Sequence, residues 1–512
     1  MRAVLGLLAL AVVAAPFAAV RQYEAHRRAV ADQAPAPGGG DARPRGSGGG
    51  PPAAPVVLAY HDVAPDAGGR YTVTPRSLDA QLSALRAAGY RTLSTAEFTA
   101  YLRTGRPPAR RSVYLTFDDG TRGLWVHADP ILAKYRMKAA AYLITGLVGT
   151  HRPYYLSWQE TARMAGSGRW DFQAHTRHSH RRAPVDASGR TGSVLANRLW
   201  LPARGRLETE DEYRRRIEAD LDGSARDLAD HGLPAARLFA YPFSETAQRT
   251  NLAGRDVSLL QRLLRARFAA ALTNTAPRPL PAGPRAAAAG QAQRLEVLSS
   301  TTPARLLRQV SEWTSVTPGQ VREPLRRPGR WQASDGTPEA VLAALTGRGP
   351  HAARTGCLTA RYRPVATADW TAYRVRATAA GLRSTSNSVS VTVRDGSSRP
   401  VTLTVGRNTA RLTDRVTGTP APGAAAGGAP RTRTGRLAPS AAHRLTLLVS
   451  PRRVRAVVDG RTVLALRTPP GSDPAEHSGG FALAARNATA GAWPRFTALD
   501  VAPPTPPTPP TD

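Results

Sequence analysis

The stretch VYLTFDDG, residues 113–120, decides the fold of the first half of the chain. Its first five residues are apolar, aromatic or β-branched and predict a short buried strand. The strand runs directly into Asp118, Asp119 and Gly120. Parallel α/β proteins gather their functional groups at the carboxyl ends of their strands. The stretch therefore predicts such a sheet, with a site at its edge.

The segments on both sides of this strand alternate between strand and helix patterns. Residues 56–60, VVLAY, form an apolar strand, and Thr74 followed by a proline opens an amphipathic helix. Further along, Thr209 and Glu212 form a capping box ahead of a long amphipathic helix. Strand–helix alternation over residues 55–318 is typical of a (β/α) barrel or an open α/β sheet.

The apolar period changes to two after about residue 335. Apolar residues at 373, 375 and 377 alternate with polar residues, and an Asp-Gly pair at 459–460 predicts a hairpin turn. Many short strands without helices indicate an all-β sandwich over residues 335–503. The sandwich loosely resembles concanavalin A-like and laminin-G-like modules, which implies an accessory, carbohydrate-binding module.

Both ends of the chain differ from the two domains. Residues 1–30 contain an uncharged apolar run at 3–20 that is long enough to cross a bilayer, and they predict a signal anchor or a cleaved signal peptide. Residues 31–54 are a Pro/Gly/Ala linker, and residues 504–512 are a Pro/Thr tail. This organisation predicts an extracytoplasmic protein that is membrane-anchored or secreted.

The composition is strongly basic. Lysine and arginine number 70 and aspartate and glutamate 37, for a formal net charge of +33 over 512 residues. The arginines are scattered along the chain and no nucleic-acid-binding motif accompanies them, so we expect no nucleic acid as partner. A positive surface attracts anionic cell-envelope polymers by charge. The single cysteine excludes a disulfide scaffold within one chain.

Polar residues follow several of the predicted strands at the point where each ends. His61 follows the first strand, the two aspartates follow the second, and His175 and His180 lie just after the third. One carboxylate and two imidazoles suit a divalent metal with open positions. The two histidines are about 140° apart on an ideal helix, so they need a loop to converge. Adjacent aspartates point in different directions, which allows one to bind metal while the other acts as a base.

Three motifs in this order resemble the polysaccharide deacetylases of the NodB-homology type, carbohydrate esterase family four. They are TFDDG at 116–120, HTRHSH at 175–180 and AYPFS at 240–244. Three further stretches narrow the resemblance to the branch of poly-β-1,6-N-acetylglucosamine N-deacetylases: AYHDV at 59–63, YLSWQE at 155–160 and RLEV at 294–297. The resemblance covers roughly residues 55–315 and implies a distorted (β/α) barrel there, which the all-β sandwich would follow.

The resemblance also implies roles for individual residues. Asp118 would be the general base, and Asp119, His175 and His180 would bind a divalent metal, with Zn²⁺ favoured over Ni²⁺, Co²⁺ and Fe²⁺. His61, at the end of the first strand, is the best candidate for the general acid. His178 would not be a ligand.

Two features depart from the family pattern. Ala240 stands where the widespread pattern has an arginine that steers the base, and Arg237 is the nearest substitute candidate. The late histidine that usually acts as the acid is absent, because no histidine lies between His231 and His351. Because of the first departure, the sequence does not say which arginine orients Asp118. Because of the second, His61 is considered as the general acid.

The leading expectation is an extracytoplasmic, metal-dependent N-deacetylase that hydrolyses acetamide groups of an N-acetylglucosamine polymer. A poly-β-1,6-linked exopolysaccharide is the preferred substrate and peptidoglycan the next. The alternatives are a non-catalytic glycan-binding protein and an esterase that removes O-acetyl groups from xylan-type glycans.

Overall fold

The computed structural model describes residues 53–66, 68–246, 250–252, 255–351, 355–415, 430–470, 477–488 and 492–504. The predicted anchor, nearly all of the predicted linker and the tail from residue 505 lie outside the described residues. Among the helices described, none combines the length and the apolar character that a bilayer crossing requires.

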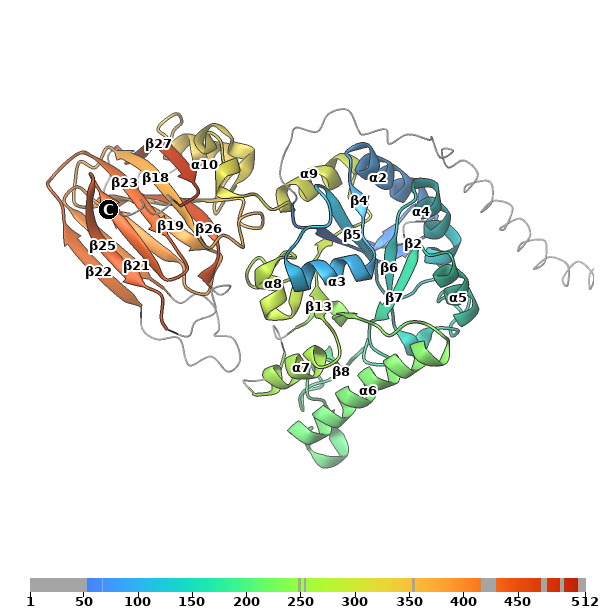
Figure 1. Cartoon of the computed structure of the whole chain (residues 1–512). Helices are drawn as coiled ribbons and strands as arrows, with labels where there is room; N and C mark the ends of the chain where they lie inside the picture. Colours follow the sequence, from blue (N-terminus) through green and yellow to red (C-terminus); the bar gives the residue numbers. More distant parts are fainter. Residues whose placement is uncertain are drawn as a thin grey trace, which may run out of the picture. The chain divides into compact units, whose positions relative to one another are not determined.

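The described chain divides into two compact units (Figure 1). The first contains the residues up to Thr275 together with Arg294–Val310. The second contains Ala276–Gln293 and the residues from Ser311 onward. The division therefore differs from the boundary expected between residues 318 and 335, because residues 276–293 group with the second unit.

The first unit is built on a parallel sheet. The strands of this sheet lie in the order β14 (Gln291–Gln293), β13 (Ala270–Thr273), β12 (Leu238–Ala240), β7 (Trp170–Ala174), β6 (Ala139–Leu143), β5 (Ser112–Phe117), β1 (Val56–Tyr60) and β15 (Leu295–Glu296), and β4 (Arg91–Thr92) pairs with β5. Every residue of β1 and β5 is buried, as expected for parallel strands covered on both faces. The nearly closed, barrel-like sheet confirms the predicted (β/α) barrel.

Helices surround this sheet (Figure 1). They are α2 (Pro75–Ala87), α3 (Thr95–Thr104), α4 (Asp129–Tyr135), α5 (Trp158–Gly166), α6 (Glu210–Asp230), α7 (Arg255–Arg265) and α9 (Pro303–Trp313). The predicted capping box is present, since Thr209 accepts from the N–H of Glu212 and the Glu212 side chain accepts from the N–H of Thr209. Local sequence signals thus set where α6 begins.

Smaller elements fill the loops of the first unit. The short strands are β2 (Asp62–Val63), β3 (Thr72–Val73), β8 (Arg182–Pro184), β9 (Thr191–Ser193), β10 (Trp200–Leu201) and β11 (Arg206–Leu207). The short helical turns are Leu124–Ala128, Thr145–Leu147, Pro202–Arg204 and Pro242–Ser244.

The second unit contains two antiparallel sheets, which confirms the predicted sandwich. One has the order β16 (Trp331–Ala333), β17 (Gly356–Tyr362), β26 (Gly480–Asn487), β19 (Asn387–Asp395), β20 (Val401–Val405), β21 (Thr409–Asp414) and β22 (Arg431–Arg436). The other has the order β25 (Arg461–Arg467), β24 (Arg453–Val458), β23 (Ala442–Val449), β18 (Tyr373–Ala380) and β27 (Arg495–Ala502). This unit also contains α8 (Pro284–Ala289), β14 (Gln291–Gln293), α10 (Pro338–Leu345) and the turns Pro318–Gln320, Pro324–Arg326 and Pro328–Arg330.

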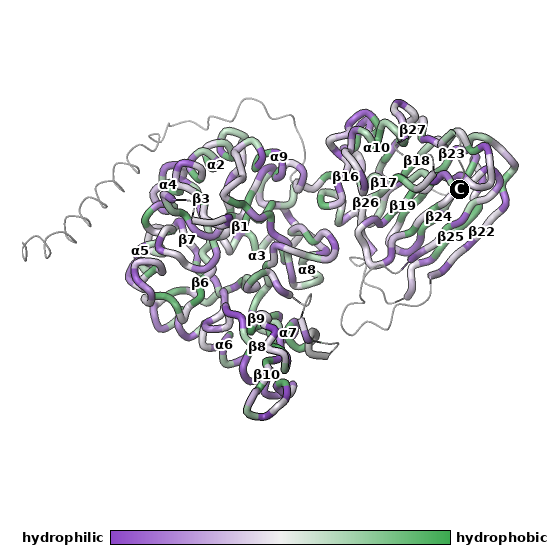
Figure 2. Tube along the Cα trace, turned by 180° about the vertical axis from the view of Figure 1, so that it is seen from behind, coloured by the Kyte–Doolittle hydropathy of each residue, from purple (hydrophilic) through white to green (hydrophobic). Residues whose placement is uncertain are grey.

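The sandwich core follows the period-two pattern. Tyr373, Val375 and Ala377 are buried, and the residues between them face outward. Hydrophobic and hydrophilic colours alternate along these strands (Figure 2). The Tyr373 hydroxyl donates to backbone carbonyl oxygens and accepts from the N–H of Arg394, so its polar group is satisfied inside the core.

Candidate metal centre and active site

The site lies at the carboxyl ends of the barrel strands. In β1 and β5 the partner residues run from Val56 and Val113 to Tyr60 and Phe117, so His61 and Asp118 leave the sheet at the same level. The N–H of Asp118 continues the ladder and donates to the carbonyl oxygen of Tyr60 at 3.0 Å. The parallel register therefore places the candidate acid next to the candidate base.

Asp119, His175 and His180 converge on one point. Their candidate ligand atoms all lie within 4.8 Å of one another. Asp119 Oδ1 lies 3.5 Å from His175 Nε2 and 3.4 Å from His180 Nε2. The same oxygen is buried and has no hydrogen-bond partner among the described residues. A buried oxygen between two imidazole nitrogens, left without a partner, fits a divalent metal with three protein ligands.

The two candidate histidine ligands have different environments. His175 Nδ1 donates to the carbonyl oxygen of Ala240 at 2.8 Å, so its Nε2 carries the lone pair that faces Asp119. Burial, and next the neighbouring His175, lower the pKa of His180 to about 4. For His175, burial opposes protonation, but the contact with the Asp119 carboxylate and the charges of Asp118 and Asp119 raise the pKa of the ring. A metal ion at this Nε2 would take the place of the proton, because a ligand nitrogen must be unprotonated.

A carboxylate on α6 explains how two histidines that are five residues apart come together. The Asp220 carboxylate accepts from the N–H groups of Arg177 and His178 at 3.0 and 2.8 Å. Thr176 has a φ of 73°, which turns the chain sharply after His175. His178 itself is exposed, in agreement with the expectation that it is not a ligand.

Asp118 has a different partner from Asp119. The fully buried guanidinium of Arg294 donates to Asp118 Oδ1 at 2.7 Å and to Oδ2 at 2.6 Å. Burial opposes ionisation of this carboxyl, but the opposite charge of Arg294 outweighs burial and holds the pKa of Asp118 far below its ordinary value. Asp118 is therefore an ionised carboxylate fixed in one orientation.

The arginine beside Asp118 is not the one considered from the sequence. Arg237 is exposed and precedes β12, so it lies at the amino end of that strand, away from the rim. Arg294 precedes β15, which pairs with β1 inside the barrel. The sequence holds one hint of Arg294, its position at the start of the RLEV stretch. That stretch served only to narrow the resemblance, and no role was assigned to its arginine.

His61 lies beside the base. Its Nε2 is 3.9 Å from Asp118 Oδ2, and its ring centroid is 4.7 Å from that of Tyr71. Its Nδ1 is buried without a hydrogen-bond partner in the described part of the chain. The His61 ring is not hydrogen-bonded to the carboxylate, but a single water molecule or substrate atom can contact both groups.

Aromatic side chains border the site. Tyr71, Tyr154 and Phe243 are the exposed large hydrophobic residues of the described chain, at 42%, 53% and 42% exposure. The Phe243 ring lies 4.7 Å from the ring of His180. Burial and the nearby charges of Asp62 and Asp119 raise the pKa of Tyr154 to about 12. The opening thus offers flat apolar surfaces beside polar groups, which is how proteins hold sugar rings.

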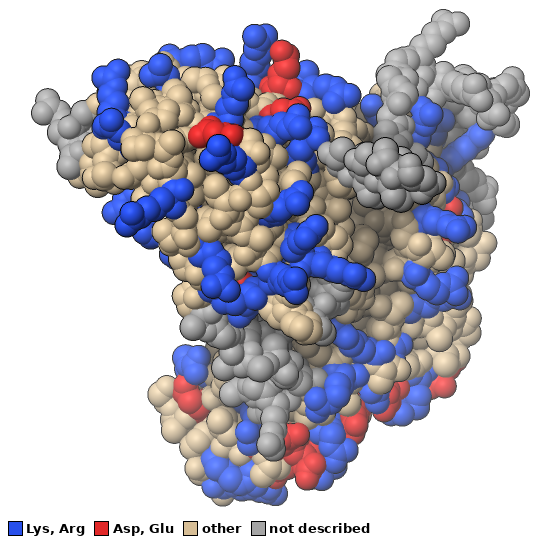
Figure 3. Space-filling model, turned by 60° about the vertical axis from the view of Figure 1, so that its left-hand side comes forward, with Lys and Arg blue, Asp and Glu red and all other residues tan. Residues whose placement is uncertain are grey.

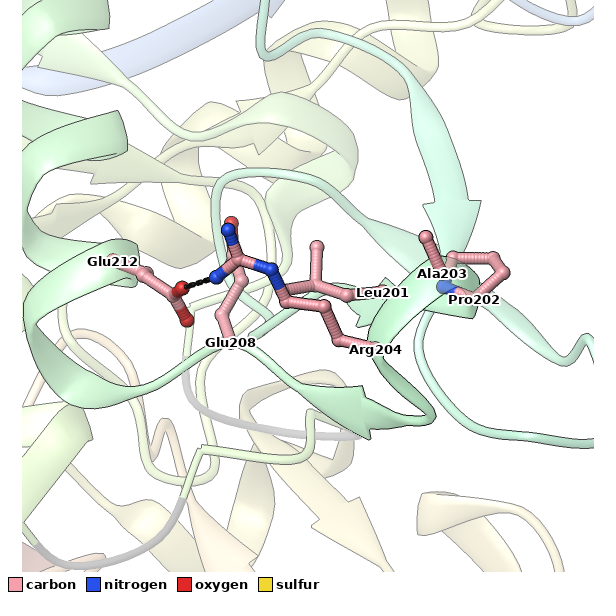
Figure 4. A pocket seen from close by; sticks show the side chains of 6 residues that line it. All are labelled: Leu201, Pro202, Ala203, Arg204, Glu208 and Glu212. Carbon is pink, nitrogen blue, oxygen red and sulfur yellow. Dashed lines mark hydrogen bonds and ion pairs between the residues drawn. The ribbon is translucent and has the colours of Figure 1, made fainter.

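A separate pocket of about 330 Å³ lies beside the hairpin of β10 and β11 (Figure 4). Its lining contains two carboxylates, and both are paired with arginines: Glu212 with Arg204 and Arg206, and Glu208 with Arg216. None of the residues of the candidate site lines it. Its charges are satisfied internally, so it contributes no group to the chemistry.

A parallel barrel whose rim carries an Asp-His-His cluster next to an arginine-held carboxylate has the groups of a hydrolytic site: three candidate metal ligands and a candidate base. Residues 105–259 match the family model of polysaccharide deacetylase. The match confirms the resemblance seen in the motifs for this part of the barrel, and the matched family is one of hydrolases.

Several known proteins are similar to parts of this chain. A poly-β-1,6-N-acetyl-D-glucosamine N-deacetylase of Escherichia coli K12 is 28% identical over 205 residues, which are 37% of this chain and 30% of that protein. The protein of the same name from Staphylococcus epidermidis is 34% identical over 113 residues, 22% of this chain and 39% of that protein. The chain thus spans only about a third of the length of these relatives. The solved structure of IcaB from Ammonifex degensii is 25% identical, covers 51% of this chain and 96% of its own, and superposes with a TM-score of 0.39.

Proposed function

We propose that this protein is an extracytoplasmic, metal-dependent N-deacetylase of an N-acetylglucosamine polymer. One observation carries the proposal: the Asp119–His175–His180 cluster stands beside Asp118, a second carboxylate that Arg294 holds ionised. The names of the similar proteins favour a poly-β-1,6-linked polymer as substrate. Peptidoglycan is the next candidate.

Asp119, His175 and His180 would hold the metal, and we favour Zn²⁺ because two imidazoles and one carboxylate are among its common ligands. Ni²⁺, Co²⁺ and Fe²⁺ have related preferences. When bound, such a metal supplies Lewis acidity to an acetamide oxygen and lowers the pKa of water from 15.7 towards about 7.

Asp118 accepts the proton of the attacking water in this proposal. Arg294 donates to both carboxylate oxygens, which fixes the carboxylate, and each oxygen keeps a further lone pair that can accept a proton. The arginine also keeps Asp118 deprotonated at neutral pH. A fixed, ionised base needs no reorganisation when the water attacks the carbonyl carbon.

His61 donates a proton to the leaving amine. The C–N bond of a tetrahedral intermediate breaks slowly unless the nitrogen is protonated, because an amide anion is a very poor leaving group. His61 Nε2 lies 3.9 Å from Asp118 Oδ2, so the proposed acid is close to the proposed base. The products are acetate and a glucosamine unit with a free amine.

The proposed substrate and the first residues of the chain support the extracytoplasmic location. Polymers of N-acetylglucosamine lie outside the cytoplasmic membrane, and the apolar run at 3–20 with the linker 31–54 suits an anchored or secreted domain. Full-length protein that stays with membranes after a high-salt wash indicates an anchor. Protein released by salt alone indicates a cleaved signal.

Acetate release from defined oligomers tests the function. We expect release from β-1,6-linked N-acetylglucosamine oligomers, its loss with chelator and its return with Zn²⁺. His180→Ala should lose both metal and turnover, whereas His178→Ala, the matched control in the same loop, should retain both. His61→Ala should lower turnover while metal content is unchanged.

Other outcomes of this assay contradict parts of the proposal. Faster release from acetylated xylan oligomers indicates an O-acetyl esterase. Glycan binding without any acetate release, in metal-loaded protein, indicates a non-catalytic binding protein. Full metal occupancy in His180→Ala shows that the ligand set is wrong.

A further inference from the structure

The outer face of the five-stranded sheet of the sandwich is lined with arginine. In β18 the buried residues alternate with Arg374 and Arg376, which face outward. The same alternation in the neighbouring strands adds five more arginines at outward positions. We call this set the arginine face: Arg374, Arg376, Arg444, Arg453, Arg455, Arg467 and Arg495.

The strand register brings these arginines close together. Arg453 on β24 lies directly opposite Arg467 on β25. Leu448 on β23 lies between Arg374 on β18 and Arg455 on β24, so these two arginines are about 10 Å apart at two strand spacings. Residues two apart in one strand are separated by about 7 Å. Like charges placed opposite each other destabilise a sheet unless an anion lies between them.

Little negative charge on the sheet offsets these arginines. Asp500 is the one acidic residue at an outward position of the five strands, and it lies 3.9 Å from Arg374. The other six arginines of the face form no ion pair within the residues that the structure describes. Asp459, in the turn between β24 and β25, is held by His443 and by the N–H of Arg444. Lys and Arg side chains outnumber acidic ones across the whole view in Figure 3.

The other sheet of the sandwich shows that this pattern is not only the result of an arginine-rich composition. Its outward positions are dominated by serine and threonine, which bond to one another across the strands. The pairs are Ser390–Thr404 at 2.9 Å, Thr392–Thr402 at 2.9 Å and Thr413–Thr432 at 3.1 Å. Arginine is present at the outward positions of this sheet as well, but less often. It occurs there as Arg361, Arg411, Arg436 and Arg486, and Arg361 is paired with Asp395.

We propose that the arginine face binds a linear polymer that carries one phosphodiester per repeat between polyol units. Guanidinium groups bind phosphate oxygens in pairs, and spacings of about 5 to 10 Å match successive charges along such a chain. Between the arginines lie Thr378, Thr446, Leu448, Val457 and Ala465, none of them aromatic. A face without aromatic rings offers no stacking surface for nucleobases or for sugar rings.

This binding does not depend on the deacetylase activity. Its effect is to hold the enzyme close to an anionic envelope polymer, which raises the effective concentration of the catalytic domain there. The attraction is electrostatic, so it weakens steeply with ionic strength.

The test compares two quadruple variants of the full-length chain. The first, Arg376→Gln/Arg453→Gln/Arg455→Gln/Arg467→Gln, removes four charges from the arginine face. The control, Arg411→Gln/Arg433→Gln/Arg436→Gln/Arg486→Gln, removes four exposed charges from the other sheet. Binding to a poly(glycerol phosphate) chain is measured by titration calorimetry at several salt concentrations, and unfolding midpoints confirm that both variants fold. If the quadruple variant does not fold, the double variant Arg376→Gln/Arg455→Gln replaces it in the same measurement.

We expect the first variant to bind at least about tenfold more weakly and to show a shallower slope of log K against log salt, by about 3. The control should stay within about twofold of the parent chain. Acetate release from short soluble oligomers should be unchanged in both, which separates this proposal from the proposed function. Equal weakening in the two variants, or tighter binding of the parent to polygalacturonate or single-stranded DNA, overturns the proposal.

Discussion

At the scale of single residues, two adjacent aspartates acquire different chemistry from different neighbours. Asp119 has a φ of 72°, which turns its side chain out of the strand direction towards the two histidines. Aspartate tolerates this left-handed conformation better than most residues. Asp118 keeps the strand direction and meets Arg294 inside the barrel. Conformation and charge thus separate the two carboxylates into the roles that we propose, a metal ligand for Asp119 and a base for Asp118.

Replacing Arg294 tests this division. Arg294→Met leaves the buried carboxylate of Asp118 without its cation, so we expect turnover to fall by a factor of about 100 or more while metal content is unchanged. The free energy of unfolding should drop by about 3–5 kcal/mol, the usual cost of breaking a buried ion pair. Turnover is followed by acetate release and stability by denaturant unfolding.

Arg237→Met is the control for Arg294→Met. Arg237 is exposed and forms its contacts through the backbone, which the substitution does not touch. We expect wild-type turnover and stability within about 0.5 kcal/mol. A loss of turnover in Arg237→Met equal to that of Arg294→Met would show that the wrong arginine has been assigned.

At the scale of elements, α6 shapes the proposed metal site without contributing a ligand to it. Asp220 on this helix accepts both N–H groups of the turn between His175 and His180. Asp227, about two turns further along, accepts from Arg177 Nε and from the Thr145 hydroxyl. The helix therefore fixes the irregular loop that brings the two histidines together.

Asp220→Ala tests whether this carboxylate holds the loop in place. The substitution frees two backbone donors of the loop, and we expect the affinity for Zn²⁺ to fall by about 10- to 100-fold, the usual effect of losing an outer partner of a metal site. Affinity is measured by competition with a chelator of known strength. Asp222→Ala, which removes a carboxylate of the same helix that pairs with Arg267, should leave the affinity unchanged. An unaltered Zn²⁺ affinity in Asp220→Ala would contradict the role given to α6.

At the scale of the whole molecule, residues 276–293 connect the two units in an unexpected way. This segment belongs to the second unit, whereas its chain neighbours Thr275 and Arg294 belong to the first. The buried Arg285 donates to Ser478 and to the carbonyl oxygen of Gly396, and its N–H donates to Asp369. The sandwich therefore holds the segment that leads directly into Arg294.

This arrangement predicts the result of truncation. The sequence pattern alone predicts that a chain ending near residue 330 keeps its activity on short oligomers. The structure predicts a loss, because the truncated chain retains Arg285 but lacks Asp369, Gly396 and Ser478. We expect trypsin to cleave after Arg285 rapidly in the truncated chain and slowly in the full one, with acetate release from short oligomers reduced at least about tenfold. Equal cleavage rates and equal turnover in the truncated and the full-length chain would show that the sandwich is an accessory domain.

Local patterns in the sequence determined much of this protein. The apolar runs of β1 and β5, the capping box at Thr209 and the period of two in β18 all depend on neighbours within a few residues. Such signals are readable because strand alternation and helix capping are short-range effects. The candidate ligands could be predicted for the same reason, since they stand at the ends of strands.

Only the tertiary structure decided which distant groups meet. Arg294 and Asp118 are 176 residues apart, and Asp220 lies 42 residues beyond the His178 N–H that it accepts. Barrel closure places β15 beside β1, and with it Arg294 beneath the rim. The assignment of residues 276–293 to the sandwich depends on Arg285 in the same way. Local sequence does not encode these pairings, because each depends on how whole strands and helices pack after long connections have closed.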